Sequence, residues 1–409
     1  MTPRLVDGGG LELGGGLEVL LAAVLEPSAP GEQVEIALDT RSAALELPGW
    51  ARAAGHEVVD ERRQDGRWLL TVRRGARQRI LAPALPDVEP HRGDPHVSGW
   101  REGVGPVPET ADPAAGLVPL GAVAEAGGPA HAWRLNERDG LWSDDLGALT
   151  EGAAATQWDA TRDIPWADAG PLPEFLERAT CQVVTFIAQN EYAAYYVPAR
   201  FMPAVNPQYT EVLLWLASHA HDEARHVEAF TKRSLVGGAR AYALAATERS
   251  LQSLLLEPDF TASALLLNVL GEGSFIDLLQ FVAAHAPDAA TATAARLAHR
   301  DELRHVRFGV SHVRRVLERD PAARSRLVAA AEARAARLVD LTGISPVVSE
   351  ALTLMAAQTL QPAQLSEAAA DVRGLLARTA ENRVTRLLEA GFDEPSARHI
   401  SDLHTPNLM

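Results

Sequence analysis

The chain has 409 residues, of which 47% are hydrophobic and 22% charged, a composition typical of a globular protein with more than one domain. Its formal net charge of −16 argues against binding to nucleic acid or to an anionic membrane surface, because both partners require a basic face. Cys181 is the one cysteine, so an intrachain disulfide framework is excluded. With no signal-peptide pattern and no uninterrupted apolar run of about 18 residues, the sequence predicts a cytoplasmic protein.

The first region, residues 1–75, alternates short β-like and helix-like runs. Residues 34–39 (VEIALD) and 67–74 (RWLLTVRR) are rich in β-branched and aliphatic side chains, which favours strands. Residues 17–25 and 43–55 carry apolar side chains at helical spacing. The pattern predicts a small α+β unit.

Residues 76–150 are rich in proline and glycine, which predicts a linker or an irregular arm that packs on the next domain. Residues 151–409 follow, and their Ala-, Leu-, Glu- and Arg-rich segments, separated by prolines, predict a helical bundle. The fold class expected for the whole chain is therefore mainly α. The expected helices span residues 174–196, 207–233, 239–256, 259–285, 288–318, 321–342, 346–358 and 362–391.

Two five-residue segments within the helical region are nearly identical. Residues 222–226 read DEARH and residues 301–305 read DELRH, and each segment lies in the middle of an expected helix. Glutamate and histidine are three residues apart in both segments, which places them on one helix face about one turn apart. Each pair can therefore bind the same metal ion.

Each segment also has an upstream carboxylate partner. Glu191 lies 223 − 191 = 32 residues before Glu223, and Glu272 lies 302 − 272 = 30 residues before Glu302. Separations of this size suit antiparallel helical hairpins, in which both carboxylates lie at a similar depth. The unit therefore occurs twice, which predicts a four-helix bundle with a pseudo-two-fold axis.

These glutamates lie on apolar helix stripes, as Glu272 does among Val269, Phe275 and Ile276. Four buried carboxylates cannot all stay ionised without compensation, and two divalent cations would neutralise them. Mixed oxygen and imidazole ligands favour two iron ions, or iron with manganese, over magnesium, calcium or structural zinc. The predicted metal ligands are Glu191, Glu223, His226, Glu272, Glu302 and His305.

The residues beside these ligands suggest a supporting layer. Asp222 and Asp301 can accept hydrogen bonds from the imidazole N–H groups and so fix the histidine tautomers. Arg225 and Arg304 can pair with those two aspartates across the pseudo-two-fold axis. The alternative is that the four residues form surface salt bridges.

The doubled Asp-Glu-x-Arg-His pattern resembles the ferritin-like non-haem di-iron carboxylate oxygenases, a similarity that covers residues 170–315. The bacterial multicomponent monooxygenase hydroxylases share the pattern. The resemblance implies that the first three ligands bind one iron and the last three serve the other. It further implies that Glu223 and Glu302, the candidate catalytic carboxylates, bridge the two irons.

Two branches of that superfamily carry a further characteristic residue near the metal ligands, and this sequence differs from both. Phe230 stands where the ribonucleotide reductase small subunit places its radical tyrosine, which excludes a stable tyrosyl radical there. The amine N-oxygenases carry an additional histidine one turn before the last Glu-x-x-His. His299 lies three residues before Glu302, so it is a candidate extra ligand, with a core or supporting role as the alternative. His219 and His221 are further candidates near the site.

The N-terminal region resembles the TusA/SirA-like sulfur-carrier family. The similarity runs through Leu17–Leu20, Pro30–Glu32, Leu38–Thr40, Leu47–Trp50 and Gly55–Glu57. The family's functional Cys-Pro falls at Gly14-Gly15, so the resemblance implies a degenerate domain that serves docking or structure. The alternative is an unrelated small α+β unit.

Together these features predict an oxygenase that activates dioxygen to hydroxylate, N-oxygenate or desaturate a small organic substrate. It would need an external electron donor, a ferredoxin or a reductase, and a homodimer is compatible with the sequence. A ferroxidase or peroxide scavenger would keep the metals without an organic substrate. A protein-binding module built on two degenerate domains is the third alternative.

Overall fold

The computed structural model describes residues 3–76, 107–118, 129, 131–238, 241–338 and 345–404. The chain divides into two compact units, Met1–Arg92 and Gly93–Met409, each of which is described by itself. Of the predicted linker, residues 77–106, 119–128 and 130 lie outside the described residues.

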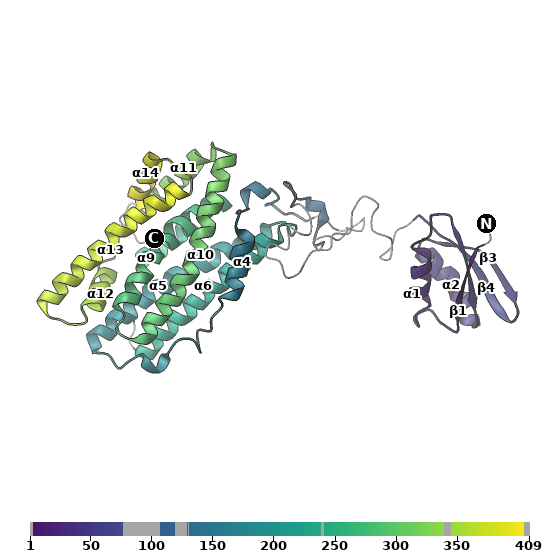
Figure 1. The fold of residues 1–409 in the computed structure, drawn as a ribbon, viewed down its shortest axis with the longest axis horizontal. Coiled ribbons are helices and arrows are strands. Elements are labelled where there is room, and N and C mark those ends of the chain that lie inside the picture. Colours follow the sequence, from purple (N-terminus) through teal and green to yellow (C-terminus); the bar gives the residue numbers. More distant parts are fainter. Residues whose placement is uncertain are drawn as a thin grey trace. The chain divides into compact units, whose positions relative to one another are not determined.

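The N-terminal unit is a four-stranded sheet with two helices (Figure 1). Its elements are β1 (Arg4–Gly9), α1 (Leu17–Leu25), β2 (Gln33–Leu38), α2 (Arg41–Ala53), β3 (Glu57–Gln64) and β4 (Arg67–Arg73). The strand order is β1-β2-β4-β3, with β1 parallel to β2 and β4 antiparallel to both neighbours. Buried residues such as Leu21, Ile36, Leu47 and Leu70 join helices and strands in one core.

The predicted helices and the two central strands of this unit are confirmed, but the sequence did not predict the edge strands β1 and β3. β3 reads EVVDERRQ, and most of its side chains are exposed and charged. β1 ends in two glycines, which weaken the strand signal. Edge strands commonly carry charges that oppose pairing with another chain, so these two strands lack the alternation that identifies a half-buried strand.

The second unit is mainly helical, and four long helical segments at its centre position the candidate site (Figure 1). These are α5 (Glu174–Phe201), α6 (Thr210–Gly237), the continuous run α8 (Phe260–Ala264), η5 (Leu265–Glu272) and α9 (Gly273–His285), and α10 (Ala289–Arg319). Around them lie α4 (Leu146–Ala155), α7 (Ala245–Leu255), α11 (Ala323–Arg337), α12 (Pro346–Ala357), α13 (Pro362–Glu389) and α14 (Glu394–His404). The expected fold class, mainly α with a small N-terminal α+β unit, is confirmed.

Most predicted helices agree with the structure to within a few residues, and the larger differences have local causes. α5 continues through Pro198 to Phe201, although proline normally ends a helix, because both residues are buried in the bundle. The short helices α4 and α14 were not predicted. α4 reads LGALTEGAAA, in which two glycines weaken the helix signal, and α14 reads EPSARHISDLH, which is mostly polar.

The segment η5 is a π-helix inserted in an otherwise α-helical run. Its backbone approaches α10 closely at Gly309, where an added Cβ would lie 2.5 Å from the Cβ of Asn268. Only glycine therefore fits on α10 at this contact. π-Helical turns are rare and often occur at functional sites, and Glu272 is the last residue of this one.

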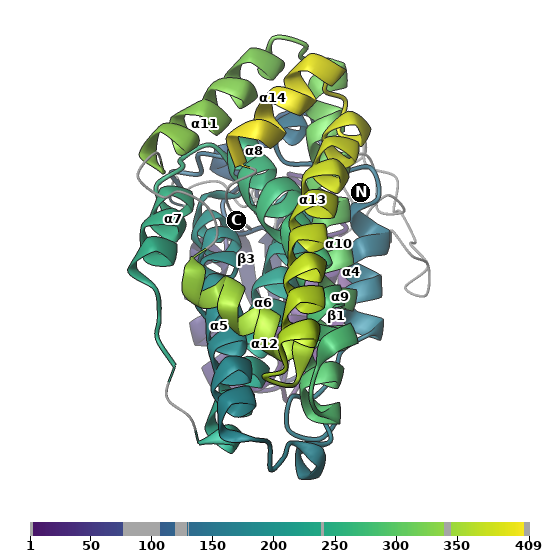
Figure 2. The same ribbon diagram turned by 90° about the vertical axis from the view of Figure 1, so that its left-hand side faces the viewer.

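The run Phe260–His285 is long and apolar enough, by length and composition, to pass as a membrane span. Within the bundle, however, 89% of its most apolar window is buried against the protein. Its composition is therefore explained by its place at the centre of the helical unit (Figure 2).

Candidate metal centre

The helical unit brings all six predicted ligands into its interior. Glu191 comes from α5, Glu223 and His226 from α6, Glu272 from η5, and Glu302 and His305 from α10. None of these side chains is more than 3% exposed. The two Glu-x-x-His helices face each other, and the upstream glutamates approach from the other two segments.

The first cluster forms around Nδ1 of His226. This nitrogen lies 3.2 Å from Oε2 of Glu223, 3.6 Å from Oε1 of Glu302 and 3.8 Å from Oε1 of Glu191. One ligand atom from each of the four residues lies within 4.8 Å of the others. The group therefore offers three carboxylates and one imidazole to a single ion.

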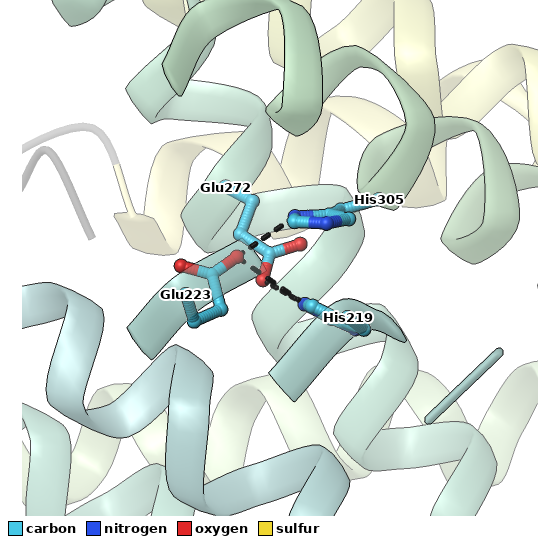
Figure 3. Close-up of side chains that lie close together, drawn as sticks. All are labelled: His219, Glu223, Glu272 and His305. Carbon is cyan, nitrogen blue, oxygen red and sulfur yellow. Dashed lines mark hydrogen bonds and ion pairs between the residues drawn. The ribbon is translucent and has the colours of Figure 1, made fainter. Parts of the chain in front are cut away.

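The second cluster contains His219, Glu223, Glu272 and His305 (Figure 3). Nδ1 of His305 lies 2.8 Å from Oε1 of Glu223. Nε2 of His219 lies 2.9 Å from Oε1 of Glu272 and 3.5 Å from Oε1 of Glu223. The two imidazole rings stack with centroids 3.9 Å apart, so both present a nitrogen to the same space.

Two carboxylates connect the clusters. Glu223 directs Oε2 toward His226 and Oε1 toward His305. Glu302 does the same, with Oε1 3.6 Å from Nδ1 of His226 and Oε2 3.4 Å from Nδ1 of His305. This arrangement suits two ions that share both Glu-x-x-His carboxylates.

The site fits metal ions because several of its buried ligand atoms have no hydrogen-bond partner among the residues that the structure describes. These atoms are Oε1 of Glu191, Oε1 of Glu223, both carboxylate oxygens of Glu302, and Nδ1 of His305. Unsatisfied buried oxygens are costly unless something else coordinates them. Four carboxylates also match the charge of two divalent cations, and the mixed oxygen and nitrogen donors suit iron or manganese.

The aspartates beside the ligands bond to the histidine of the opposite segment. Nε2 of His226 lies 3.3 Å from Oδ2 of Asp301, and Nε2 of His305 lies 3.3 Å from Oδ2 of Asp222. An ionised aspartate can only accept, so each Nε2 carries the hydrogen. The lone pair of each imidazole is then on Nδ1, which faces the carboxylates and is free to bind a metal.

Arg225 and Arg304 each pair with both aspartates. Arg225 donates to Asp222 at 2.5 Å and to Asp301 at 2.8 Å. Arg304 donates to Asp301 at 2.7 Å and to Asp222 at 3.0 Å. Because Asp222 and Asp301 are almost fully buried, these are interior ion pairs that hold the two Glu-x-x-His helices together.

Trp158 donates a further hydrogen bond to one of these aspartates, which the sequence did not predict. Its indole Nε1 donates to Oδ2 of Asp301 at 2.7 Å, and its ring stacks on that of His226 at 6.2 Å. The guanidinium of Arg225 lies 4.6 Å from the centre of the indole. Asp301 therefore receives hydrogen bonds from tryptophan, arginine and histidine at once.

Replacing Trp158 with phenylalanine should lower the free energy of unfolding by about 1.5–3 kcal/mol, because a buried carboxylate loses a donor. Trp166→Phe, at a partly buried position, is the control for the loss of an indole donor, since that indole donates to the neutral carbonyl of Ala160 at 3.0 Å. The control should lose only about 0.5–1.5 kcal/mol. Urea denaturation measures the free energy of unfolding of both variants. An equal decrease in the two variants would show that the hydrogen bond to Asp301 contributes no more than one to a neutral carbonyl.

The pKa values of the metal-free carboxylates differ with their surroundings. Burial, and then the charge of Glu223, raise the pKa values of Glu191 and Glu302 well above the ordinary range. Burial also acts to raise the pKa of Glu223, but His226 and His305 outweigh it and hold that pKa low. Without metal, the site therefore favours protons on Glu191 and Glu302.

Other histidines named from the sequence have different surroundings. Burial acts to lower the pKa of His219, but Glu272 and Glu223 raise it to about 10. His299 lies in neither cluster and is only half buried; burial lowers its pKa, and its charged neighbour is Asp277. His221 is exposed on α6. His219 is thus the histidine that the structure adds to the six predicted ligands.

A small apolar cavity adjoins His219, with a volume of about 20 Å³. Its walls come from α5, α6, α8, η5 and α10, and are mostly apolar, with Phe201, Phe260 and Phe308 among them. Ser263 and Asn268 are its polar members besides His219. A cavity of this volume holds about one water molecule.

Comparison with solved structures finds R2-like ligand-binding oxidases. A variant with an aerobically reconstituted Mn/Fe cofactor is 17% identical, with a TM-score of 0.46, covering 61% of this chain and 94% of that protein. A second variant, with an Fe/Fe cofactor, is 16% identical with a TM-score of 0.47 and the same coverage. At such low identity and TM-score, the likeness says nothing of the chemistry of this chain. No protein-family model matches the sequence.

The N-terminal region is similar to a protein of Archaeoglobus fulgidus that is named as a candidate sulfur carrier. The two are 34% identical over 44 residues, which is 11% of this chain and 60% of the archaeal protein. This chain therefore spans less than two thirds of that relative. The similarity lies in the region where the sequence resembles TusA/SirA-like domains.

Proposed function

We propose that this protein is a ferritin-like di-iron oxidoreductase that uses dioxygen to oxidise a small organic substrate. The observation that carries the proposal is the pair of buried clusters joined by Glu223 and Glu302. Inward-facing glutamates on two helices, with Glu-x-x-His on the other two, are the ligand pattern of ferritin-like di-iron and di-manganese carboxylate proteins. When bound, two ferrous ions would supply electrons and open coordination positions for dioxygen.

The protein's own groups would hold and orient this centre. Asp222 and Asp301 keep both imidazoles in the metal-binding tautomer, and the arginine pairs fix the aspartates. The cavity beside His219 has mostly apolar walls and has room for a molecule of the size of dioxygen, and a substrate would lie against it. We therefore place the substrate on the His219 side of the centre.

The proposal is tested by loading the metal-free protein with ferrous iron under anaerobic conditions and then adding oxygen. We expect two iron ions per chain, an oxygen-dependent optical band, and a trial substrate that gains one oxygen atom or loses two hydrogens by mass analysis. Mössbauer spectra would distinguish an iron pair from isolated ions. Failure to bind iron stoichiometrically would contradict the proposal.

The cavity offers a second, more specific prediction. Ala264→Val should occupy the cavity and reduce product formation by about ten-fold or more, because one extra or missing methylene in an apolar pocket changes specificity by roughly 10–200-fold. Leu267→Ala should instead admit bulkier substrates. Both variants should still bind two iron ions. Unchanged product formation in both variants would place the substrate elsewhere.

The small volume of the cavity favours a ferroxidase or peroxide scavenger as the second candidate. Such a protein needs space for dioxygen or peroxide but none for an organic molecule. Repeated turnover of ferrous iron without any organic product would support this candidate over the first.

Oxygenation that inserts one oxygen atom and reduces the other to water needs two external electrons and two protons. We propose that a ferredoxin or a reductase supplies these electrons, in the cytoplasm, to a protein that forms a monomer or a homodimer. The N-terminal unit would serve docking or structure, because Gly14 and Gly15 stand where sulfur carriers of that family have Cys-Pro. Residues 1–75, 76–150 and 151–409 remain our proposed domain, linker and catalytic domain.

A further inference from the structure

The carboxylate of Glu272 differs from the other three ligand carboxylates in how its oxygens are bonded. Its Oε1 faces the second cluster and lies 2.9 Å from Nε2 of His219 (Figure 3). Its Oε2 accepts a hydrogen bond from Nδ2 of Asn268 at 2.6 Å. Each of the other three glutamates has a buried oxygen with no hydrogen-bond partner among the described residues. Glu272 therefore offers one oxygen to the second cluster while its other oxygen is already held.

The side chain of Asn268 is well placed to hold this oxygen. Asn268 lies on η5, four residues before Glu272, and is only 4% exposed. Because a carboxylate can only accept, the amide nitrogen of Asn268 is the atom that faces it. Asn268 also packs closely on α10, since a Cβ added at Gly309 would lie 2.5 Å from its own Cβ. This packing limits the movement of Asn268, so its amide can restrain the carboxylate.

The two residues that bond to Glu272 also line the small apolar cavity. His219 and Asn268 both belong to its wall, and its volume is about 20 Å³. His219 is at the same time a member of the second cluster. The cavity and the second cluster therefore adjoin where Glu272 is held, and a small molecule in the cavity would meet the second ion.

A glutamate can bind an ion through one oxygen or through both, and binding through both uses an additional coordination position. Catalytic metal sites keep a position open for water or substrate. We propose that Asn268 is a positioning residue that holds Oε2 of Glu272 away from the second ion and so keeps one coordination position open toward the cavity. The inference rests on the proposed function in one respect, because it requires two bound ions.

The restraint by Asn268 has a consequence that is separate from stability. Without the amide donor, Oε2 of Glu272 is free to turn toward the second ion and occupy the open position. The chain should then still bind two ions, but a small molecule would have to displace this oxygen in order to bind. A role of Asn268 in packing alone would instead lower the number of bound ions and leave small-molecule binding to the remaining ion unchanged.

The test loads the full chain with ferrous iron under anaerobic conditions and titrates it with nitric oxide, which has two atoms as dioxygen has. Asn268→Leu keeps a side chain that branches at the same carbon but removes the donor. We expect wild type and variant to bind two iron ions each. The Kd for nitric oxide should rise by about ten-fold or more in the variant, the factor that one hydrogen bond to a charged group represents. Optical absorption and electron paramagnetic resonance measure the bound nitric oxide.

Asn190→Leu is the matched control. Asn190 is 1% exposed and directly precedes the ligand Glu191, but its Nδ2 donates to the carbonyl oxygen of Phe186 at 2.7 Å. This variant should bind nitric oxide as wild type does. If Asn268→Leu does not fold, Asn268→Ala removes the same donor without adding volume and should weaken nitric oxide binding in the same direction.

Unchanged affinity for nitric oxide in an Asn268 variant that binds two ions would overturn the inference. Loss of an ion from that variant, with normal nitric oxide binding at the ion that remains, would also overturn it and leave Asn268 a packing role. A wild-type chain that binds two ions but no nitric oxide would overturn the inference and leave the proposed function standing. A wild-type chain that binds no iron would contradict the proposed function itself.

Discussion

Replacing Glu223 with alanine should remove both metal ions at once. Its Oε2 lies 3.2 Å from Nδ1 of His226 in one cluster, and its Oε1 lies 2.8 Å from Nδ1 of His305 in the other. Loss of the shared carboxylate removes one anionic ligand from each ion. In a buried site, an ion whose positive charge is not balanced by its ligands binds much more weakly. Metal analysis after anaerobic loading should fall from two ions per chain to none.

Two other variants separate this result from general damage to the fold. Glu272 lies in the second cluster alone, so Glu272→Ala should lose one ion and keep the other. Glu228→Ala changes an exposed glutamate on the same helix as Glu223 and should keep both ions. Two ions in Glu223→Ala, or equal loss from Glu223→Ala and Glu272→Ala, would contradict the sharing of Glu223.

Removing the metals should destabilise the protein increasingly as the pH rises from 5.5 to 8. Glu191 and Glu302 have folded-state pKa values raised well above 4.5 by burial and by Glu223. Their contribution to stability is present below pH 4.5 and is lost as pH rises through the folded pKa. His219, with a pKa raised from 6.5 to about 10 chiefly by Glu272, adds stability that is complete below pH 6.5 and falls toward pH 10.

Bound ions change this pH dependence because they take the place of the protons. Metal binding should release protons, and the stability of the loaded protein should vary little over the same range. Each proton held only by the folded, metal-free protein costs about 1.4 kcal/mol per pH unit. At a thousand-fold excess over Kd, each ion adds about 4 kcal/mol.

Anaerobic calorimetry of the metal-free and the iron-loaded protein at several pH values measures this difference. We expect the gap between the two unfolding temperatures to widen from pH 5.5 to pH 8. Glu302→Gln should flatten the curve of the metal-free protein, because the amide does not titrate. A gap that is constant with pH, or that narrows, would mean that these carboxylates do not carry protons in the metal-free state.

The convergence of the six candidate ligands could be predicted from the sequence because helix geometry relates residue spacing to direction. A Glu-x-x-His pair faces one way on any α-helix, and two copies with matched upstream glutamates leave few other arrangements. The sequence could not rank the remaining histidines. His219 lies four residues before Glu223 and His299 three residues before Glu302, and both offsets keep a side chain near the same face.

What distinguished these two histidines was their neighbours from other helices. Glu272 brings a carboxylate oxygen to within 2.9 Å of His219 from η5. The crossed bonds between aspartates and histidines likewise depend on how α6 and α10 align, which no local pattern contains. Trp158 lies 143 residues from its partner Asp301, so this bond could not be predicted from the sequence either.

The π-helix η5 changes the direction in which side chains point between the residues before it and the residues at its end. Residues before it, such as Phe260 and Ser263, line the cavity, whereas Glu272 at its end reaches toward His219. Bonds from each residue to the fifth along, in place of the fourth, absorb one extra residue between these two parts. The lining of the cavity can therefore vary through substitutions in α8 while the orientation of the carboxylate stays constant, which would allow related chains to change specificity and conserve the coordination chemistry.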